Sequence, residues 1–445
     1  MKTNKKLLAQ LALLAVSVPA FAQTTYYFDL NGNTSGFGAL GGTWSLTNPL
    51  WTDSAQGTAT RVNWNNNAST PNNAVLDYTD GKNPSEITLT DSLNIRNLTV
   101  QNFAASITTT SFISTATTTV DRTLTLKFGS NSTLDIGNAN TATSDFGIRS
   151  FQSSAGATNQ INVEGGFNKS GNGVLQFQAI SSAVGAGTAN IKISGTVNVQ
   201  NGGIALFTNG SSTTASRTID VSQATFALSA NTSLATVNAL SATNAASGTG
   251  MAKLGIVTGT GTIRGDAVGG NTLTYSAAGL QPGEIGTIGT LNIADNTLAG
   301  TSVWTNTASV AGNTAFTFVD IEVGGLKFDL AAPGSSDKLA FSGLSSIDLA
   351  GLNFNQFEFN TVSGFGTTGS YILMDGLTSI GASVLGTKTG TIGGLDAVLS
   401  LSGTTLVLNV SASAIPEPAT YAALVGLGIL GFVGFRRRGT EKATS

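Results

Sequence analysis

The chain of 445 residues contains no cysteine and no histidine. The lack of cysteine excludes disulfides, thiolate nucleophiles and Cys-ligated metals. The lack of histidine excludes a Ser-His-Asp triad, imidazole acid–base chemistry and His-ligated zinc. Because catalysis would have to rely on carboxylates, Lys, Arg or Tyr, we expect a protein that is not an enzyme and that has no cofactor or metal.

Charge is also scarce, since charged residues make up 10% of the chain, against about 25% in ordinary soluble domains. Seven of the 21 basic residues lie close to the two ends, so the intervening chain is acidic and has no basic patch. This balance argues against nucleic acid as a partner, because phosphates require Lys and Arg clusters. The 55 glycines and the many Thr, Ser and Asn residues indicate a large β protein with an uncharged polar surface.

Residues 1–22 have the three parts of a secretory signal peptide. Three lysines precede a short apolar run over residues 7–18, and Pro19 ends that run. Ala20 and Ala22 form the small-x-small pattern that signal peptidase recognises, so the mature chain is expected to begin at Gln23. An uncleaved anchor helix is the alternative interpretation.

The C-terminal segment, residues 415–445, also has three parts in order. The motif Ile-Pro-Glu-Pro-Ala-Thr occupies residues 415–420, an apolar run follows over 419–435, and Arg436, Arg437 and Arg438 close it. A helix over 419–435 would be about 25 Å long, somewhat short of a hydrocarbon core of about 30 Å. We therefore expect a short transmembrane helix with its arginines on the cytoplasmic side.

These three parts resemble the PEP-CTERM protein-sorting domain, whose Pro-Glu-Pro motif corresponds to Pro416, Glu417 and Pro418. The resemblance implies an exported protein of a bacterium that makes extracellular polysaccharide. It also implies passage through the inner membrane, cleavage near the motif by the transpeptidase exosortase, and delivery to the cell surface or beyond. An ordinary C-terminal anchor after a stiff proline linker is the alternative.

The body, residues 23–414, consists of short segments in which apolar and polar residues alternate, as in 124–128, 161–163, 191–193 and 406–410. A period of two predicts β-strands with one buried face. Pairs of Gly and Asn between these segments predict turns. The fold class is therefore all-β, and the length favours a parallel β-helix of roughly 15–20 turns over β-sandwich-like domains.

Parts of the body resemble proteins with autotransporter-associated β-strand repeats. The similar parts are the Trp-containing start and the Gly-Thr-Gly, Pro-Gly and Asp-x-Leu segments after residue 255. The resemblance implies a right-handed parallel β-helix, a passenger-like body and a passive role in surface display, adhesion or matrix association. Extracellular polysaccharide is then a possible partner of the body.

Three groups of residues are candidate sites, each with a plainer structural interpretation. Trp44, Trp51 and Trp64 could stack on sugars, but capping the end of the solenoid is the favoured role. The acid pairs Asp320/Glu322 and Asp77/Asp80 could cleave glycosides, although solvated strand faces are favoured. Asp29 opens a calcium-like loop, but Thr34 and Leu40 replace the required Gly and Glu.

Two functions are therefore carried forward. The favoured one is a non-enzymatic exported protein of the cell surface or extracellular matrix, with a role in adhesion or in exopolysaccharide and biofilm association. The alternative is a carbohydrate-binding or carbohydrate-cleaving β-helix protein.

Overall fold

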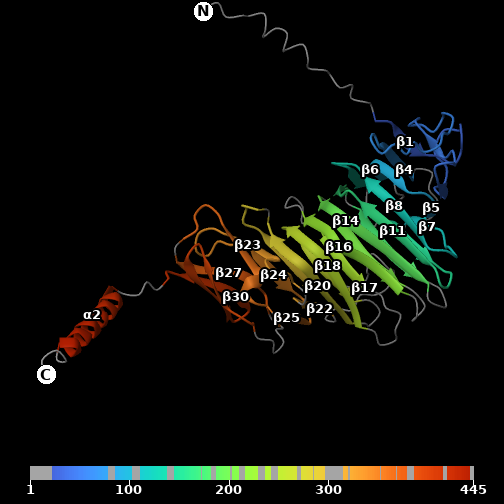
Figure 1. Ribbon diagram of the computed structural model, residues 1–445. Helices are drawn as coiled ribbons and strands as arrows, with labels where there is room; N and C mark the ends of the chain where they lie inside the picture. The colour runs from blue at the N-terminus through green and yellow to red at the C-terminus, as the bar shows by residue number, and fades with distance from the viewer. Residues whose placement is uncertain are drawn as a thin grey trace, which may run out of the picture.

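The computed structural model describes residues 23–440, with gaps at 79–85, 103–110, 138–144, 172, 182–186, 201–202, 210–215, 229–235, 242–248, 268–271, 284, 296–313, 319–320, 351, 367, 378–384 and 414–417. The described chain forms two large β-sheets, here called sheet A and sheet B, and one α-helix near the C-terminus (Figure 1).

Sheet A contains sixteen strands within the described residues. They are β1 (Thr25–Phe28), β3 (Trp51–Thr52), β4 (Asn72–Asp77), β6 (Leu93–Gln101), β8 (Arg122–Phe128), β9 (Thr133–Ile136), β11 (Thr158–Glu164), β12 (Phe167–Ser170), β14 (Thr188–Val199), β16 (Ser216–Leu228), β18 (Thr249–Gly259), β20 (Thr272–Pro282), β22 (Thr314–Thr317), β23 (Leu326–Leu330), β25 (Ser346–Asp348) and β26 (Phe357–Thr361).

Sheet B contains fourteen strands over the same part of the chain. They are β2 (Gly42–Trp44), β5 (Glu86–Leu89), β7 (Ser111–Thr115), β10 (Asp145–Gln152), β13 (Val174–Ser181), β15 (Gly203–Asn209), β17 (Thr236–Ser241), β19 (Thr262–Ala267), β21 (Thr290–Asp295), β24 (Lys338–Ser342), β27 (Gly369–Asp375), β28 (Thr389–Ile392), β29 (Leu395–Ser402) and β30 (Thr405–Ser411). The helices are the short 3-10 helix η1 (Phe354–Gln356) and α2 (Pro418–Thr440).

From β4 to β27 the chain passes back and forth between the two sheets, and successive strands within each sheet pair in parallel. One passage through both sheets is longer than the roughly 20 residues expected per turn. Ile161 of β11, for example, lies opposite Ile191, 30 residues later, and opposite Leu124, 37 residues earlier. The described chain therefore makes fewer circuits than predicted, because each circuit contains strands of both sheets and the loops that connect them.

The alternating pattern of the sequence places apolar side chains on the inner faces of both sheets. Leu124, Ile161 and Ile191 are in register across sheet A, and Ile148 and Phe177 are in register in sheet B. All five are buried and belong to one hydrophobic core that both sheets share. Since burying such a side chain contributes about 1.5–3 kcal/mol, each circuit is stabilised by its contacts with the circuits beside it.

Antiparallel pairing appears at the two ends of the described body. At the N-terminal end the two-residue strand β3 pairs antiparallel with β1. At the C-terminal end β27, β30, β29 and β28 form an antiparallel extension of sheet B. A very short end strand such as β3 limits further pairing at an exposed sheet edge. The all-β class that the sequence predicts is thus confirmed.

Candidate functional site

Of the sorting segment, residues 415–445, the structure describes only the helix α2. Pro416 and Glu417 lie outside the described residues, whereas Pro418 is the first residue of α2. Proline suits this first helical position because its fixed φ fits the helix and its missing N–H has no partner there in any case. Arg436, Arg437 and Arg438 lie near the C-terminal end of α2.

The apolar side chains of α2 are open to solvent. Figure 1 shows α2 standing clear of the two sheets, and Leu424 is 63% exposed while Phe435 is 84% exposed. Val425, Leu427, Ile429, Leu430 and Phe432 are exposed as well. A large exposed apolar patch of this kind is typical of segments that contact a lipid or protein partner.

The expected transmembrane helix over residues 419–435 is not supported. Within the described part of the chain, no helix has the length together with the apolarity that a membrane span requires. Gly426, Gly428, Gly431 and Gly434 interrupt the run and add no apolar side chain, and the run is shorter than the usual 20 or so residues. Passage through the inner membrane therefore stays a prediction.

The expected signal peptide lies outside the described residues. Ala20 and Ala22 fall in that part of the chain, and Gln23, the expected first residue after cleavage, is the first residue described. Cleavage by signal peptidase stays a prediction.

The tryptophans at the start of the body are buried and pack against one another. Trp44 and Trp51 are fully buried and Trp64 is 3% exposed. The ring centroids of Trp44 and Trp51 lie 4.5 Å apart, and those of Trp51 and Trp64 lie 4.8 Å apart. Phe28 of β1 meets the Trp51 ring edge-on at 5.2 Å. These rings form part of the core at this end, so they offer no open stacking platform for a sugar; Trp304 lies outside the described residues.

The structure describes only one member of each acid pair, so the distance between the two carboxyl groups is not defined for either pair. Asp320 and Asp80 lie outside the described residues, and Glu322 is exposed. Asp77 is buried, and its carboxylate accepts hydrogen bonds from Gln101 Nε2 at 2.8 Å and from Asn102 Nδ2 at 2.9 Å. Asp77 therefore has a structural environment.

Asp29 is fully buried in the loop that resembles a calcium site. Its Oδ1 accepts the Asn31 backbone N–H at 2.9 Å, and burial raises its pKa despite the backbone hydrogen bonds that lower it. No group of three or more acidic residues that could hold a metal ion occurs within the described ranges.

The turn after β20 is stabilised by two buried carboxyl groups, which accept hydrogen bonds from its backbone. No pattern in the sequence indicates this role. Asp337 Oδ1 accepts the Gly289 N–H at 2.7 Å, and Oδ2 accepts the Asp329 N–H at 2.8 Å. Asp329 in turn accepts hydrogen bonds from Gly286 N and Asn360 Nδ2. Burial, together with the charge of Asp329, raises the pKa of Asp337 to about 7, although its two backbone hydrogen bonds act in the opposite direction.

A buried lysine and a partly buried arginine were also missed, because a lone basic residue in an alternating segment gives no signal of burial. Lys169 Nζ donates to the carbonyls of Ser170 at 2.6 Å and Gly171 at 2.9 Å. Burial lowers the pKa of Lys169 to about 7, although Asp135 raises it.

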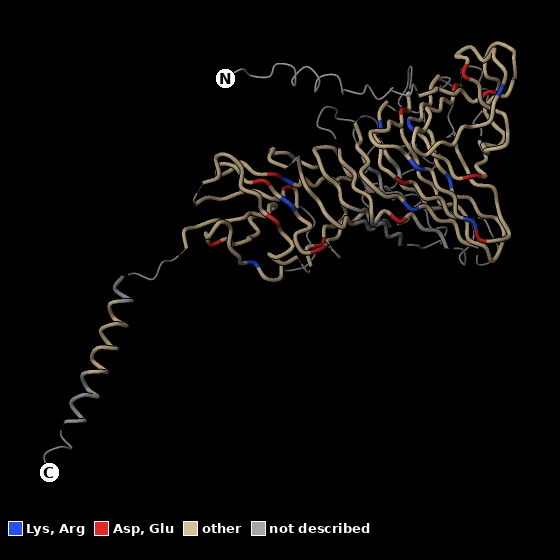
Figure 2. Tube along the Cα trace, turned by 45° about the horizontal axis from the view of Figure 1, so that its top comes forward, with Lys and Arg blue, Asp and Glu red and all other residues tan. Residues whose placement is uncertain are grey.

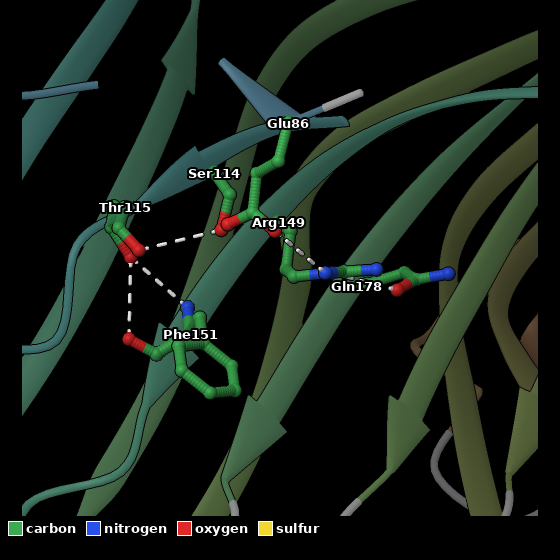
Figure 3. Close-up of polar contacts among 6 residues, drawn as sticks. All are labelled: Glu86, Ser114, Thr115, Arg149, Phe151 and Gln178. Atoms are coloured by element: carbon green, nitrogen blue, oxygen red, sulfur yellow. Dashed lines mark hydrogen bonds and ion pairs between the residues drawn. The ribbon is translucent and has the colours of Figure 1, made fainter. Parts of the chain in front are cut away.

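Arg149 crosses the strands of sheet B (Figure 3). Its Nε donates to Gln178 Oε1 at 3.2 Å and its Nη1 lies 3.4 Å from Glu86 Oε2. Thr115 links the neighbouring strands at this point, since its hydroxyl accepts the Phe151 N–H at 3.0 Å. Burial lowers the pKa of Arg149 and Glu86 raises it. The contacts tie β5, β10 and β13 together.

Comparison with known proteins identifies the tail alone. Residues 414–438 match the PEP-CTERM protein-sorting motif, in agreement with the predicted segment 415–445. No curated protein and no solved structure is similar to the chain, so the passenger-like character of the body is a proposal. The motif indicates an extracellular or surface protein that is processed by exosortase.

Proposed function

We propose that this protein is a non-enzymatic component of the cell surface or extracellular matrix, released into place by cleavage of its C-terminal tail. The observation that carries the proposal is the match of residues 414–438 to the PEP-CTERM protein-sorting motif. The sequence Pro416-Glu417-Pro418 disfavours a helix before Pro418, because proline fixes φ, lacks a backbone donor and restricts the residue that precedes it. An extended peptide is a suitable substrate for the active site of a protease such as exosortase.

Processing then occurs at both ends of the chain. Signal peptidase removes residues 1–22 during export, and the exposed apolar side chains of α2 associate with the inner membrane while the body lies outside. Exosortase cuts near Pro416, Glu417 and Pro418, and the body continues to the surface.

The body serves as a rigid, extended scaffold. Its proposed architecture is a right-handed parallel β-helix of passenger-like type, and the alternation of parallel strands between two sheets supports this proposal. Its role is adhesion, or association with exopolysaccharide and biofilm. The alternative is a carbohydrate-binding or carbohydrate-cleaving β-helix, but cleavage has little support from Asp77, which is buried and hydrogen-bonded within the body.

Mass spectrometry of both termini of the protein isolated from its own cell envelope and medium tests the processing. We expect a chain that starts at Gln23 and ends near residues 416–418. A product that still contains residues 421–438 would contradict exosortase cleavage.

A pair of tail variants sharpens the test. Glu417→Gln changes the only acid of the motif, whereas Glu441→Gln changes an acid beyond α2. We expect the Glu417→Gln protein to accumulate in its unprocessed form and the Glu441→Gln protein to be processed normally. Deletion of residues 416–445 should abolish surface deposition while the body still folds; unchanged deposition would refute the sorting role.

A further inference from the structure

The outer face of sheet A carries a row of amide and hydroxyl side chains that crosses six strands. The members of this row, here called the amide ladder, are Thr25, Asn73, Asn97, Thr133, Asn168 and Asn198, on β1, β4, β6, β9, β12 and β14. With neighbouring strands about 4.8 Å apart, the ladder is about 24 Å long.

Hydrogen bonds between neighbours hold the ladder side chains in place. Asn73 Nδ2 donates to Thr25 Oγ1 at 3.2 Å, and Asn97 Nδ2 donates to Asn73 Oδ1 at 2.9 Å. Asn97 Oδ1 accepts the Thr133 backbone N–H at 2.8 Å. Asn198 Nδ2 donates to Asn168 Oδ1 at 2.8 Å. The asparagines are therefore ordered before any ligand arrives, which lowers the entropy cost of binding.

The ladder leaves hydrogen-bonding capacity toward solvent. A primary amide has two N–H donors and two acceptor lone pairs, and the contacts of Asn97 within the ladder use one of each. The four asparagines are partly exposed. Repetition along the sheet thus produces a row of donors and acceptors with the period of the strands.

The surroundings of the ladder are polar and nearly uncharged. The ladder itself contains no ionisable residue. Two charged residues lie beside it: Arg96, next to Asn97 on β6, donates to the Ser130 carbonyl, and Asp135, in the next row, accepts a hydrogen bond from Ser170 Oγ at 2.9 Å. In Figure 2 most of the body is neither basic nor acidic, although some charged residues of opposite sign lie together, and in Figure 1 no helix covers the strands of sheet A. A ligand of this face therefore needs many hydroxyl groups and no charge.

We propose that the amide ladder binds a neutral polysaccharide laid across the strands. An extended glycan has hydroxyls on both edges, and the length of one sugar unit is close to the spacing between strands. Successive sugars can then meet successive amides. An anionic polymer is disfavoured because the body is acidic and the face has no basic cluster. This inference rests on the proposed function only in that the protein must reach a matrix that contains such a polymer.

Binding of the mature protein to insoluble neutral glucans, compared with alginate as an acidic polymer, tests the proposal. We expect retention by a neutral glucan and none by alginate. Asn97→Asp and Asn198→Asp keep the shape but remove N–H donors and add a charge, so each should weaken binding about three- to tenfold, as expected for the loss of one hydrogen bond.

Asn292→Asp is the matched control, because Asn292 is a partly exposed asparagine on sheet B, and it should bind like the unaltered protein. Circular dichroism and the unfolding midpoint identify any variant that fails to fold. Of the two ladder variants, Asn198→Asp should disturb the structure less than Asn97→Asp, because Asn198 lies at the end of the ladder. Equal loss in Asn292→Asp, retention by alginate, or no retention by any neutral glucan would overturn the proposal. A protein that is sorted normally but binds no glucan would refute the ladder alone and leave the proposed function intact.

Discussion

At the scale of single residues, the most informative group is Asp337, a carboxyl that is 1% exposed and has a pKa raised to about 7 by burial and by Asp329. In the unfolded chain its pKa is about 3.9. Between these two pH values the folded protein holds a proton that the unfolded chain has released. The contribution of Asp337 to stability is therefore present below about pH 4 and is lost as the pH rises to 7.

We expect the free energy of unfolding to fall by at most about 4 kcal/mol between pH 4 and 7 because of this group. Asp337→Asn should remove this part of the pH dependence, at a cost of about 1–3 kcal/mol because one backbone N–H loses its acceptor. Urea unfolding across the pH range measures both effects. Asp53→Asn, at an exposed aspartate, is the control; equal slopes in the two variants would contradict the assignment.

Gly259 ends β18 in a conformation that a side chain cannot share. Its φ is +101°, and a Cβ added there would lie 1.8 Å from the carbonyl oxygen of Leu228 on the neighbouring strand. Gly156 has a similar φ of +77° but nothing within 4 Å. Gly156→Ala should cost about 1–2 kcal/mol for the backbone conformation alone.

Gly259→Ala should destabilise the protein by at least about 2 kcal/mol more, because backbone must also move. Thermal or urea unfolding of both variants gives the comparison. An equal loss in the free energy of unfolding for the two variants would mean that β18 does not approach β16 as closely as the structure shows.

At the scale of elements, the alternating segments predict the strands because each inward residue must meet another inward residue of the next circuit. Residues 161–163 and 191–193 lie in β11 and β14, and Ile161 faces Ile191. What the sequence cannot predict is the length of a circuit, since loops of varied length separate strands that pair. The burial of the Asp329 and Asp337 carboxyl groups could not be predicted either. Their hydrogen-bond donors, Gly286 and Gly289, are 43 and 48 residues away in the sequence and come close only in the folded chain.

The core pairing of β14 gives a prediction at this scale. Ile191 is fully buried between Ile161 and Ile219, so Ile191→Ala should destabilise the protein by about 2–5 kcal/mol. Lys192→Ala, at the next residue on the outer face, should change stability by less than about 0.5 kcal/mol. Urea unfolding monitored by circular dichroism measures both, and similar losses would mean that the two faces of β14 are assigned wrongly.

At the scale of the whole molecule, the body and the C-terminal tail differ in what determines their structure. The body is stabilised by contacts between adjacent circuits and by the aromatic cluster of Trp44, Trp51 and Trp64 at its N-terminal end. The tail is a local signal, which is why the segment 415–445 could be identified from the sequence; residues 414–438 then match a known motif. The membrane role of α2 was the weaker part of that prediction, because it depended on a short run with four glycines.

This division predicts that the body folds without its tail. The strands end at Ser411, and α2 begins at Pro418 and stands clear of the sheets (Figure 1). A chain truncated after Ser413 should therefore unfold at the same urea concentration as the full chain and with the same dependence on denaturant, since the surface exposed on unfolding the body is unchanged. It should also be more soluble, because the exposed apolar residues of α2 are gone. A lower midpoint would mean that the tail packs on the body, and cleavage near Pro416 would then loosen the protein as well as release it.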